Sequence, residues 1–350
     1  MSDGSHPESK APMALTESRH EGSPKARSSF SRPVFSEGDP PFLKARQINV
    51  GSETEFYFYD PASKREEPLK VFAFIPEGWN EETPVLFVMH GVNRDAKEMF
   101  HKLVDKRLLP QKHHFILLVP YFSQEQFPTR AEDRKFWSFT AIENFFLALK
   151  VELKLAAPGY HIFGHSAGAQ FVHRLVAFSA SKNNKSHIIK AVAANAGFYS
   201  MPSLDMKFPY GLGRCGQLFT EEDLRIFLEA PLVVLLGEED TDPNHKHLPI
   251  GKLAAKQGKH RFERGQSFFE AGLQAAEHYG VCFGWQLQTI PGVAHEGVKM
   301  CESAVKILFP RINLPGEDAW SGSDYDSATQ LSARQRHKQS FLMRVAKKRE

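Results

Sequence analysis

Gly164-His165-Ser166-Ala167-Gly168 is the stretch that decides the fold, because an apolar, strand-like run (160–163) ends there and an amphipathic run (170–178) begins. The downstream apolar residues recur at helical spacing. A G-x-S-x-G sequence between a strand and a helix holds its serine on a sharp turn, where side chains in place of the glycines would clash. We therefore predict that the Ser166 hydroxyl projects from the carboxyl edge of a sheet, with the Ala167 N–H directed at the same point. The alternative is an ordinary strand-to-helix turn with a capping serine.

A serine hydroxyl is a weak nucleophile at neutral pH, so it needs a histidine base and a carboxylate that orients the base. In proteins with this turn, the acid follows a later strand. The apolar run 231–236 is typical of a strand buried on both faces of a parallel sheet, and Gly237-Glu238-Glu239-Asp240-Thr241-Asp242 comes directly after it. We predict that Asp240 is the acid. Asp242 is the main alternative, and Glu238 and Glu239 are further ones.

The base is expected after the last strand of the sheet. Residues 285–290 alternate like a strand, residues 291–294 turn the chain, and His295 follows. Apolar residues at helical spacing come next, from Val298 to Leu308. His295 is therefore the predicted base. The alternative is a chance placement, since the chain contains 16 histidines.

Acyl transfer also needs N–H donors for the oxyanion that develops on the substrate. Residues 84–89 are predicted to form a buried strand, and His90-Gly91-Val92-Asn93-Arg94 follows it. The loop after such a strand and the residue after the serine supply the two donors, which nominates the amides of Val92 and Ala167. Gly91 is expected to let the loop approach closely, and His90 to pack or hydrogen-bond in the loop. The alternative for His90-Gly91 is a simple turn that ends the strand.

On these residues the chain resembles the α/β-hydrolase superfamily and, within it, the group related to poly(3-hydroxybutyrate) depolymerases and small carboxylesterases. The resemblance rests on 90–94, 164–174, Gly237 with Asp240, and His295, and it spans roughly residues 50 to 312. It implies an α/β fold with a mostly parallel central sheet, helices on both faces and antiparallel opening strands. Secreted polymer depolymerases of this group carry an export signal and often a polymer-binding module. The sequence shows neither pattern, so a polymer substrate is not expected.

The order of apolar runs agrees with this fold class. Two strands at 56–59 and 71–75 are expected to form an opening antiparallel pair, and further strands are expected at 115–119 and 188–194, with a helix at 139–153. Alternation of strands and helices indicates a parallel sheet with its site at the carboxyl ends of the strands. The serine, acid, base and His-Gly motifs all fall at such ends.

Composition indicates one large domain with two tails. The chain has 350 residues, 41% of them hydrophobic, and a net charge of +3. We expect a disordered leader at 1–45, an α/β-hydrolase domain at 46–314 and a flexible basic tail at 315–350, because the leader is rich in Ser, Pro and charge without periodicity. The last thirty residues carry seven basic and three acidic side chains.

No signal peptide or membrane span is recognisable, and the three cysteines lack metal-type spacing. The sequence therefore predicts a cytoplasmic protein without a cofactor, without a nucleic-acid partner and without stable membrane insertion. The oligomeric state is left open. His245-Lys246-His247 has no carboxylate in register, so we expect a solvated loop there and no metal site.

A lid is expected at 198–223, where aromatic residues alternate with Gly and Pro. Its functional interpretation is an apolar pocket for the substrate, with four candidate lining residues: Asn195, Phe198, Tyr199 and Tyr210. The alternative is a packed connector. Thr220-Glu221-Glu222-Asp223 is typical of a helix start.

Together these patterns predict a serine hydrolase that cleaves small-molecule carboxylic esters through an acyl-enzyme. A thioesterase or an acyltransferase would use the same residues. A non-catalytic interaction protein on a hydrolase scaffold is the alternative from another functional class.

Overall fold

The computed structural model describes residues 42–45, 47–60, 67–105, 109–125, 139–179, 186–215 and 219–310. The predicted tail and residues 1–41 of the predicted leader lie outside the described residues. The boundary of the leader at residue 45 is wrong, because Phe42–Ala45 form strand β1. This strand pairs antiparallel with β2, and the Phe42 ring stacks on Tyr59 at 5.0 Å between ring centroids. The stacking of Phe42 on Tyr59 and the burial of Leu43 stabilise this strand, although the sequence around it is polar.

Nine strands form one sheet with the order β1-β2-β3-β5-β4-β6-β7-β8-β9. The pairs β1–β2, β2–β3 and β3–β5 are antiparallel, and all pairs from β5 to β9 are parallel. The strands are β1 (Phe42–Ala45), β2 (Glu53–Tyr59), β3 (Leu69–Phe74), β4 (Val85–Met89), β5 (Ile116–Tyr121), β6 (Tyr160–His165), β7 (Ile188–Ala194), β8 (Leu232–Gly237) and β9 (Gln286–Ile290). The predicted mostly parallel sheet with antiparallel opening strands is thereby confirmed.

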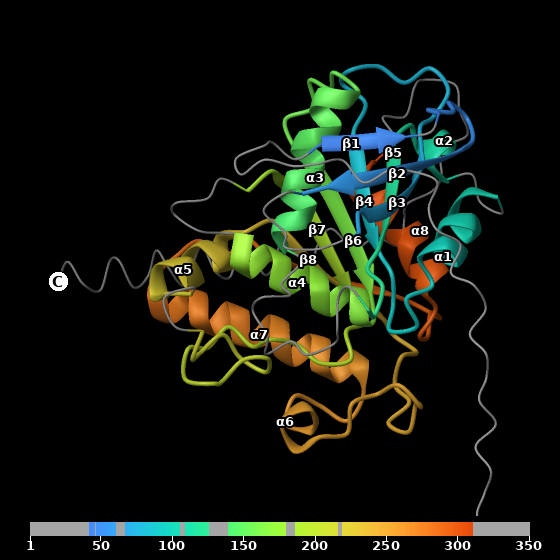
Figure 1. Cartoon of the computed structure of the whole chain (residues 1–350). Coiled ribbons are helices and arrows are strands. Elements are labelled where there is room, and N and C mark those ends of the chain that lie inside the picture. The colour runs from blue at the N-terminus through green and yellow to red at the C-terminus, as the bar shows by residue number, and fades with distance from the viewer. Residues whose placement is uncertain are drawn as a thin grey trace, which may run out of the picture. The chain divides into compact units, whose positions relative to one another are not determined.

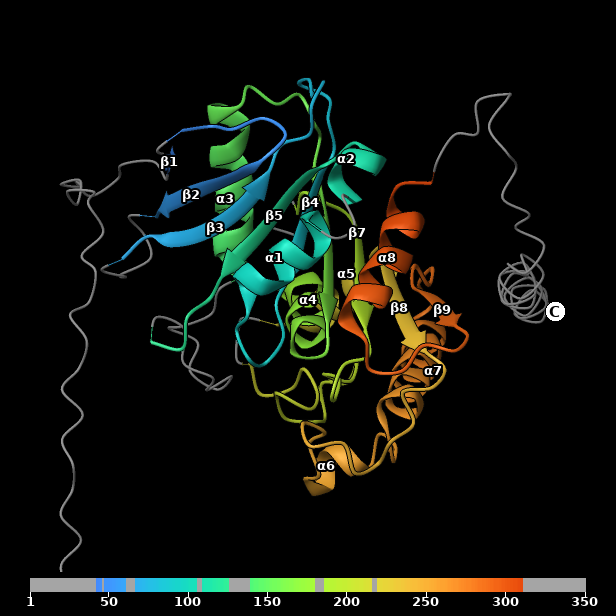
Figure 2. The same ribbon diagram turned by 90° about the vertical axis from the view of Figure 1, so that its right-hand side faces the viewer.

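Helices cover both faces of this sheet (Figures 1 and 2). The helices are α1 (Ala96–Val104), α2 (Leu109–His113), α3 (Phe139–Glu152), α4 (Ala167–Ser179), α5 (Glu221–Glu229), α6 (Lys252–Ala255), α7 (Arg261–Tyr279) and α8 (Gly297–Leu308). Side chains of α3, α4, α5 and α7 join one apolar cluster, and side chains of α1 and α8 join the other. Within the described ranges, no helix combines the length and apolar character that crossing a lipid bilayer requires.

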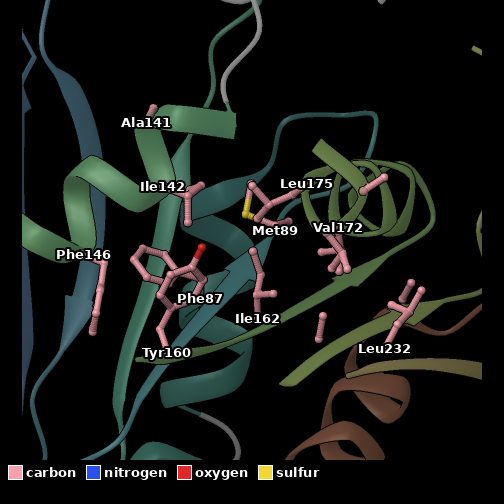
Figure 3. Close-up of a cluster of buried hydrophobic side chains, with 14 of the residues drawn as sticks. Phe87, Met89, Ala141, Ile142, Phe146, Tyr160, Ile162, Val172, Leu175 and Leu232 are labelled. Carbon is pink, nitrogen blue, oxygen red and sulfur yellow. The ribbon is translucent and has the colours of Figure 1, made fainter. Parts of the chain in front are cut away.

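The core follows the two-residue period of the strands. In β4, Val85, Phe87 and Met89 point into the first cluster, whereas Leu86 and Val88 point into the second. Figure 3 shows part of the first cluster, in which side chains of β4 and β6 meet side chains of α3 and α4. Continuous apolar runs such as 84–89 therefore reflect strands that are buried on both faces.

Two loops lie beyond the ends of the central strands. The loop after β7 and the segment around α6 occupy the lower end of Figure 2, the end to which the arrowhead of β8 points. The lid predicted at 198–223 runs into α5, because Thr220 caps that helix with a capping box that includes Asp223. The described part of the lid is therefore 198–215 and residues 219–220, and the predicted helix start is confirmed.

Candidate active site

Ser166 lies in a tight turn between a strand and a helix. Strand β6 ends at His165, helix α4 begins at Ala167, and Ser166 between them has a φ of 58°. A Cβ at Gly164 would lie 2.2 Å from the carbonyl oxygen of Gly168, and a Cβ at Gly168 would lie 2.4 Å from that of Met89. Any side chain at either position would clash with backbone atoms. The two glycines therefore allow α4 to pack closely against β6 and the end of β4.

The predicted acid and base are joined by a hydrogen bond. The side chain of Asp240 is 2% exposed, and its Oδ2 lies 2.7 Å from Nδ1 of His295. Since a carboxylate can only accept, Nδ1 of His295 carries the proton, and its Nε2 is left unprotonated in the neutral ring. This is the tautomer that a general base needs.

Two of the three alternative acids, Asp242 and Glu238, accept hydrogen bonds from other residues. Asp242 is exposed, and its carboxylate accepts from the backbone N–H of Asn244. Glu238 accepts from the hydroxyl of Thr289. Among the described residues, Asp240 is the carboxylate that contacts His295.

The base lies beside the serine turn. The ring of His295 packs against the ring of His165, the residue before Ser166, with 4.3 Å between centroids. Within the described chain, the hydroxyl of Ser166 and the ring of His295 do not form a hydrogen bond; such contacts are often long before substrate binds. The order of serine, acid and base along the chain and their position at the strand ends match the predicted arrangement.

The chain is similar to poly(aspartic acid) hydrolase-1 of Sphingomonas sp. KT-1, with 34% sequence identity, a TM-score of 0.67, and coverage of 74% of this chain and 99% of that one. It belongs to the α/β-hydrolase superfamily. It is also similar to LpqC, a poly(3-hydroxybutyrate) depolymerase of Bordetella parapertussis, with 28% identity and a TM-score of 0.66 over 76% of this chain and 92% of that one. No protein-family model matches the chain, and no curated protein matches it either.

The loop after β4 of this hydrolase is held by His90. Its Nε2 accepts from the backbone N–H of Phe122, and its Nδ1 donates to the carbonyl of Gly91. Burial lowers the pKa of His90, which keeps the ring neutral for these two bonds. His90 therefore ties the loop to the end of β5.

Val92, the predicted oxyanion donor, follows in a turn that Arg94 N–H closes onto the Gly91 carbonyl at 3.2 Å. Its side chain is 52% exposed, and its N–H makes no hydrogen bond within the described ranges. The N–H of Ala167 begins α4, where the first amides have no partner inside the helix. A Cβ at Gly91 would meet nothing within 4 Å, so close packing does not explain this glycine.

Two of the four predicted pocket residues are fully buried in this structure. Asn195 and Tyr199 are both 0% exposed. The Tyr199 ring stacks on Phe268 at 4.5 Å, because the lid folds back onto α7. Phe198 and Tyr210 remain partly exposed with rings 4.6 Å apart, so they stay candidates for the substrate pocket.

Asn195 has a structural role that its sequence does not reveal. Its Oδ1 accepts from Gly237 N–H at 2.9 Å, and its Nδ2 donates to the Ala294 carbonyl at 3.4 Å. These contacts join the loop that carries Asp240 to the turn that carries His295. Asn195 directly follows β7 and has a φ of 48°, and its side chain lies between the two loops.

Three further side chains near the base were missed by sequence reasoning. The ring of His245 lies 5.0 Å from His295, on a loop expected to be solvated. Arg261 lies 3.6 Å from Asp240, between Nη1 and Oδ1. His165 is buried, and burial with the neighbouring His295 and Arg261 lowers its pKa well below the ordinary value. No local sequence pattern predicts these contacts, because each contact joins segments that are distant in sequence and that meet only in the folded sheet.

The described residues bring together no group of three or more His, Cys, Asp or Glu side chains able to hold a metal ion. His245 and His247 approach each other, with ring centroids 5.9 Å apart. The described ranges add no third ligand of these kinds to this histidine pair.

Proposed function

We propose that this protein is a serine hydrolase that cleaves carboxylic esters through an acyl-enzyme. The observation that carries the proposal is the 2.7 Å bond between Asp240 and His295 beside a strained serine turn. Membership of the α/β-hydrolase superfamily supports the same chemistry.

In the proposed reaction, His295 Nε2 takes the proton of the Ser166 hydroxyl while the oxygen attacks the acyl carbon. The amides of Val92 and Ala167 donate to the oxyanion of the tetrahedral intermediate. When that intermediate collapses, the bond to the alcohol breaks and His295 gives its proton to the leaving oxygen. Water then attacks the acyl-enzyme by the same steps and releases the acid and Ser166.

For the substrate we propose esters with short to medium acyl chains and soluble alcohols. The aromatic pair of Phe198 and Tyr210 supports this, because it offers a modest apolar surface at the edge of the lid. Thioesters would enter the same cycle, and p-nitrophenyl thioesters assayed beside the oxygen esters separate the two classes. A transferase would show itself by acyl products that depend on an added alcohol.

A second candidate is hydrolysis of amide bonds in an acidic polymer. The 34% identical relative is a poly(aspartic acid) hydrolase. One feature of this chain favours such a substrate: the Arg174 side chain is 8% exposed, lies 5.1 Å over the Phe198 ring, and has no ion pair with a carboxylate in the described ranges. Its Nε donates to the Ser200 hydroxyl, so a cation without a carboxylate partner among the described residues lies next to the candidate pocket residue Phe198, where it would favour carboxylate-bearing chains. Release of amines from poly(aspartic acid) is the assay for this candidate.

The decisive experiment compares the wild type with Ser166→Ala. The variant is expected to lose p-nitrophenyl butyrate hydrolysis and labelling by a fluorophosphonate, while its melting temperature stays within a few degrees, because one partly exposed oxygen is removed. Labelling of Ser166→Ala at the wild-type rate would overturn the proposal. A wild type that resists labelling would favour the non-catalytic alternative.

A further inference from the structure

Arg261 is the first residue of helix α7 and is buried next to the catalytic acid. Its side chain is 0% exposed, and Nη1 lies 3.6 Å from Oδ1 of Asp240. The other carboxylate oxygen, Oδ2, is the one bonded to His295. The two oxygens of Asp240 are thus divided between a fixed cation and the base.

The first turn of α7 contacts the acid through the backbone as well. The N–H of Phe262 donates to the carbonyl oxygen of Asp240 at 3.2 Å. The N-terminal end of a helix carries a partial positive charge, which stabilises an anion placed beside it. Helix α7 has 19 residues, and its first residues therefore present both a guanidinium and a helix end to the Asp240 segment.

Burial of this guanidinium is costly unless it is paired. Its Nε and Nη1 have no hydrogen-bond partner in the described chain, and its Nη2 lies 3.3 Å from Nδ1 of His245. The separation of 3.6 Å from Asp240 is that of an ion pair rather than a hydrogen bond. Asp240 is thus the carboxylate that pairs with this buried guanidinium among the described residues, and Asp242 adds a weaker attraction from farther away.

We infer that Arg261 is a positioning residue for the triad acid, an inference that rests on the proposed function. The guanidinium attracts Oδ1 and so fixes the rotation of the Asp240 carboxylate. This leaves Oδ2 directed at Nδ1 of His295. Without the cation, the carboxylate is free to turn, and His295 loses the bond that selects its tautomer.

The test compares Arg261→Met with Arg261→Lys and with a matched control, Arg264→Met. Arg264 is also buried in α7, 2% exposed, but it donates to the backbone carbonyls of Gly258 and Gly197. We expect Arg261→Met to lower kcat about 10- to 100-fold on a soluble ester, with KM changed less than about twofold, the loss seen when partners that orient metal-binding side chains are removed. Arg261→Lys should recover part of kcat, and Arg264→Met should keep it.

Folding is checked by circular dichroism and by melting of each variant, and kcat is measured on folded protein. Arg261→Met that melts like Arg264→Met but loses kcat supports a positioning role. Unchanged kcat in folded Arg261→Met overturns it. If Arg261→Met does not fold, Arg261→Lys decides: its kcat must fall below that of the wild type while KM stays constant.

A double substitution tests the route of the effect. In an Asp240→Asn background, Arg261→Met should cost no further kcat, because the carboxylate through which it acts is gone. If the kcat losses of the two substitutions multiply in the double variant, the inference is overturned. An equal kcat loss in His245→Ala would also overturn it, since the effect would then pass through the ring that lies against His295. Activity of Ser166→Ala would instead overturn the proposed function, which keeps the two failures distinguishable.

Discussion

At the scale of single residues, three of the six described non-glycine residues with a positive φ belong to the candidate site. Ser166 at φ 58°, Asn195 at φ 48° and Arg94 at φ 57° all lie just after strands of the sheet. Non-glycine residues hold such angles only where their surroundings determine them. Here the strained positions hold the proposed nucleophile Ser166, join the loops of Asp240 and His295, and turn the loop of Val92.

Asp240→Asn and Asp242→Asn form a matched pair of substitutions two residues apart in the same loop. Asp240→Asn should lower kcat by up to about four orders of magnitude, because an amide no longer selects the His295 tautomer. Asp242→Asn should keep kcat within about twofold, since the exposed Asp242 accepts only from Asn244. Steady-state kinetics on a p-nitrophenyl ester measure both. The opposite ranking would transfer the acid role to Asp242.

Two glycines of the site make a second matched pair. Gly168→Ala should destabilise the fold by more than about 2 kcal/mol, because its Cβ would lie 2.4 Å from the Met89 carbonyl. Gly91→Ala should be tolerated, since its Cβ would meet nothing within 4 Å. Denaturant unfolding of both variants checks the difference. Equal stability of the two would contradict the close approach of α4 to β4.

At the scale of elements, α4 links the serine turn to the lid. Its His173 is 0% exposed, with Nδ1 2.7 Å from the Ala169 carbonyl and Nε2 accepting from Ser200 N–H at 3.0 Å. The neutral ring satisfies both bonds, one as donor and one as acceptor. Burial, together with the charge of Arg174, lowers the pKa of His173 well below its ordinary value.

This lowered pKa predicts a loss of stability in acid. Below about pH 6.5 the unfolded chain binds a proton at His173 and the native protein does not, so the free energy of unfolding falls as pH falls. His173→Gln can keep both hydrogen bonds without titrating. Between pH 6.5 and 5 its stability should decline less steeply than that of the wild type, by up to about 1.4 kcal/mol per pH unit.

The control is His278→Gln, an exposed histidine at the end of α7. Urea unfolding at half-unit pH steps gives the slopes. Parallel curves for the wild type and His173→Gln would show that His173 is protonated in the native protein and that the lid contact tolerates the charge.

At the scale of the whole molecule, both apolar clusters are built from residues between Leu43 and Phe309. Ser166, Asp240 and His295 lie inside the same span. The described residues thus supply both apolar clusters and all three proposed triad residues.

Deletion of residues 321–350 should leave kcat and KM for a soluble ester unchanged within about twofold. The reason is that every contact of the candidate site reported above lies N-terminal to this stretch. Kinetics and thermal melting of the shortened chain test this. A large loss of activity or of cooperative unfolding would show that the C-terminal stretch stabilises the domain.

The sequence by itself determined the fold class and the order of the triad candidates. Strands buried on both faces are continuous apolar runs, and Ser166 and Asp240 come within a few residues of the ends of two such strands, β6 and β8. His295 follows β9, an alternating and partly buried strand, after a short turn. The local pattern around each residue therefore predicted its position at the edge of the sheet. In the confirmed fold, each of these residues follows the end of a strand. Local signals were sufficient because each motif lies within a few residues of its own strand.

Only the tertiary structure decided which side chains surround the triad candidates. Strand β1 depends on pairing with β2, and Asn195 and Tyr199 are buried because the acid loop and α7 cover them. Helix α7 drew no prediction, yet it brings Arg261 to Asp240. Contacts of this kind join segments that are distant along the chain, and the free energy that forms them comes from packing of the whole sheet rather than from any local pattern.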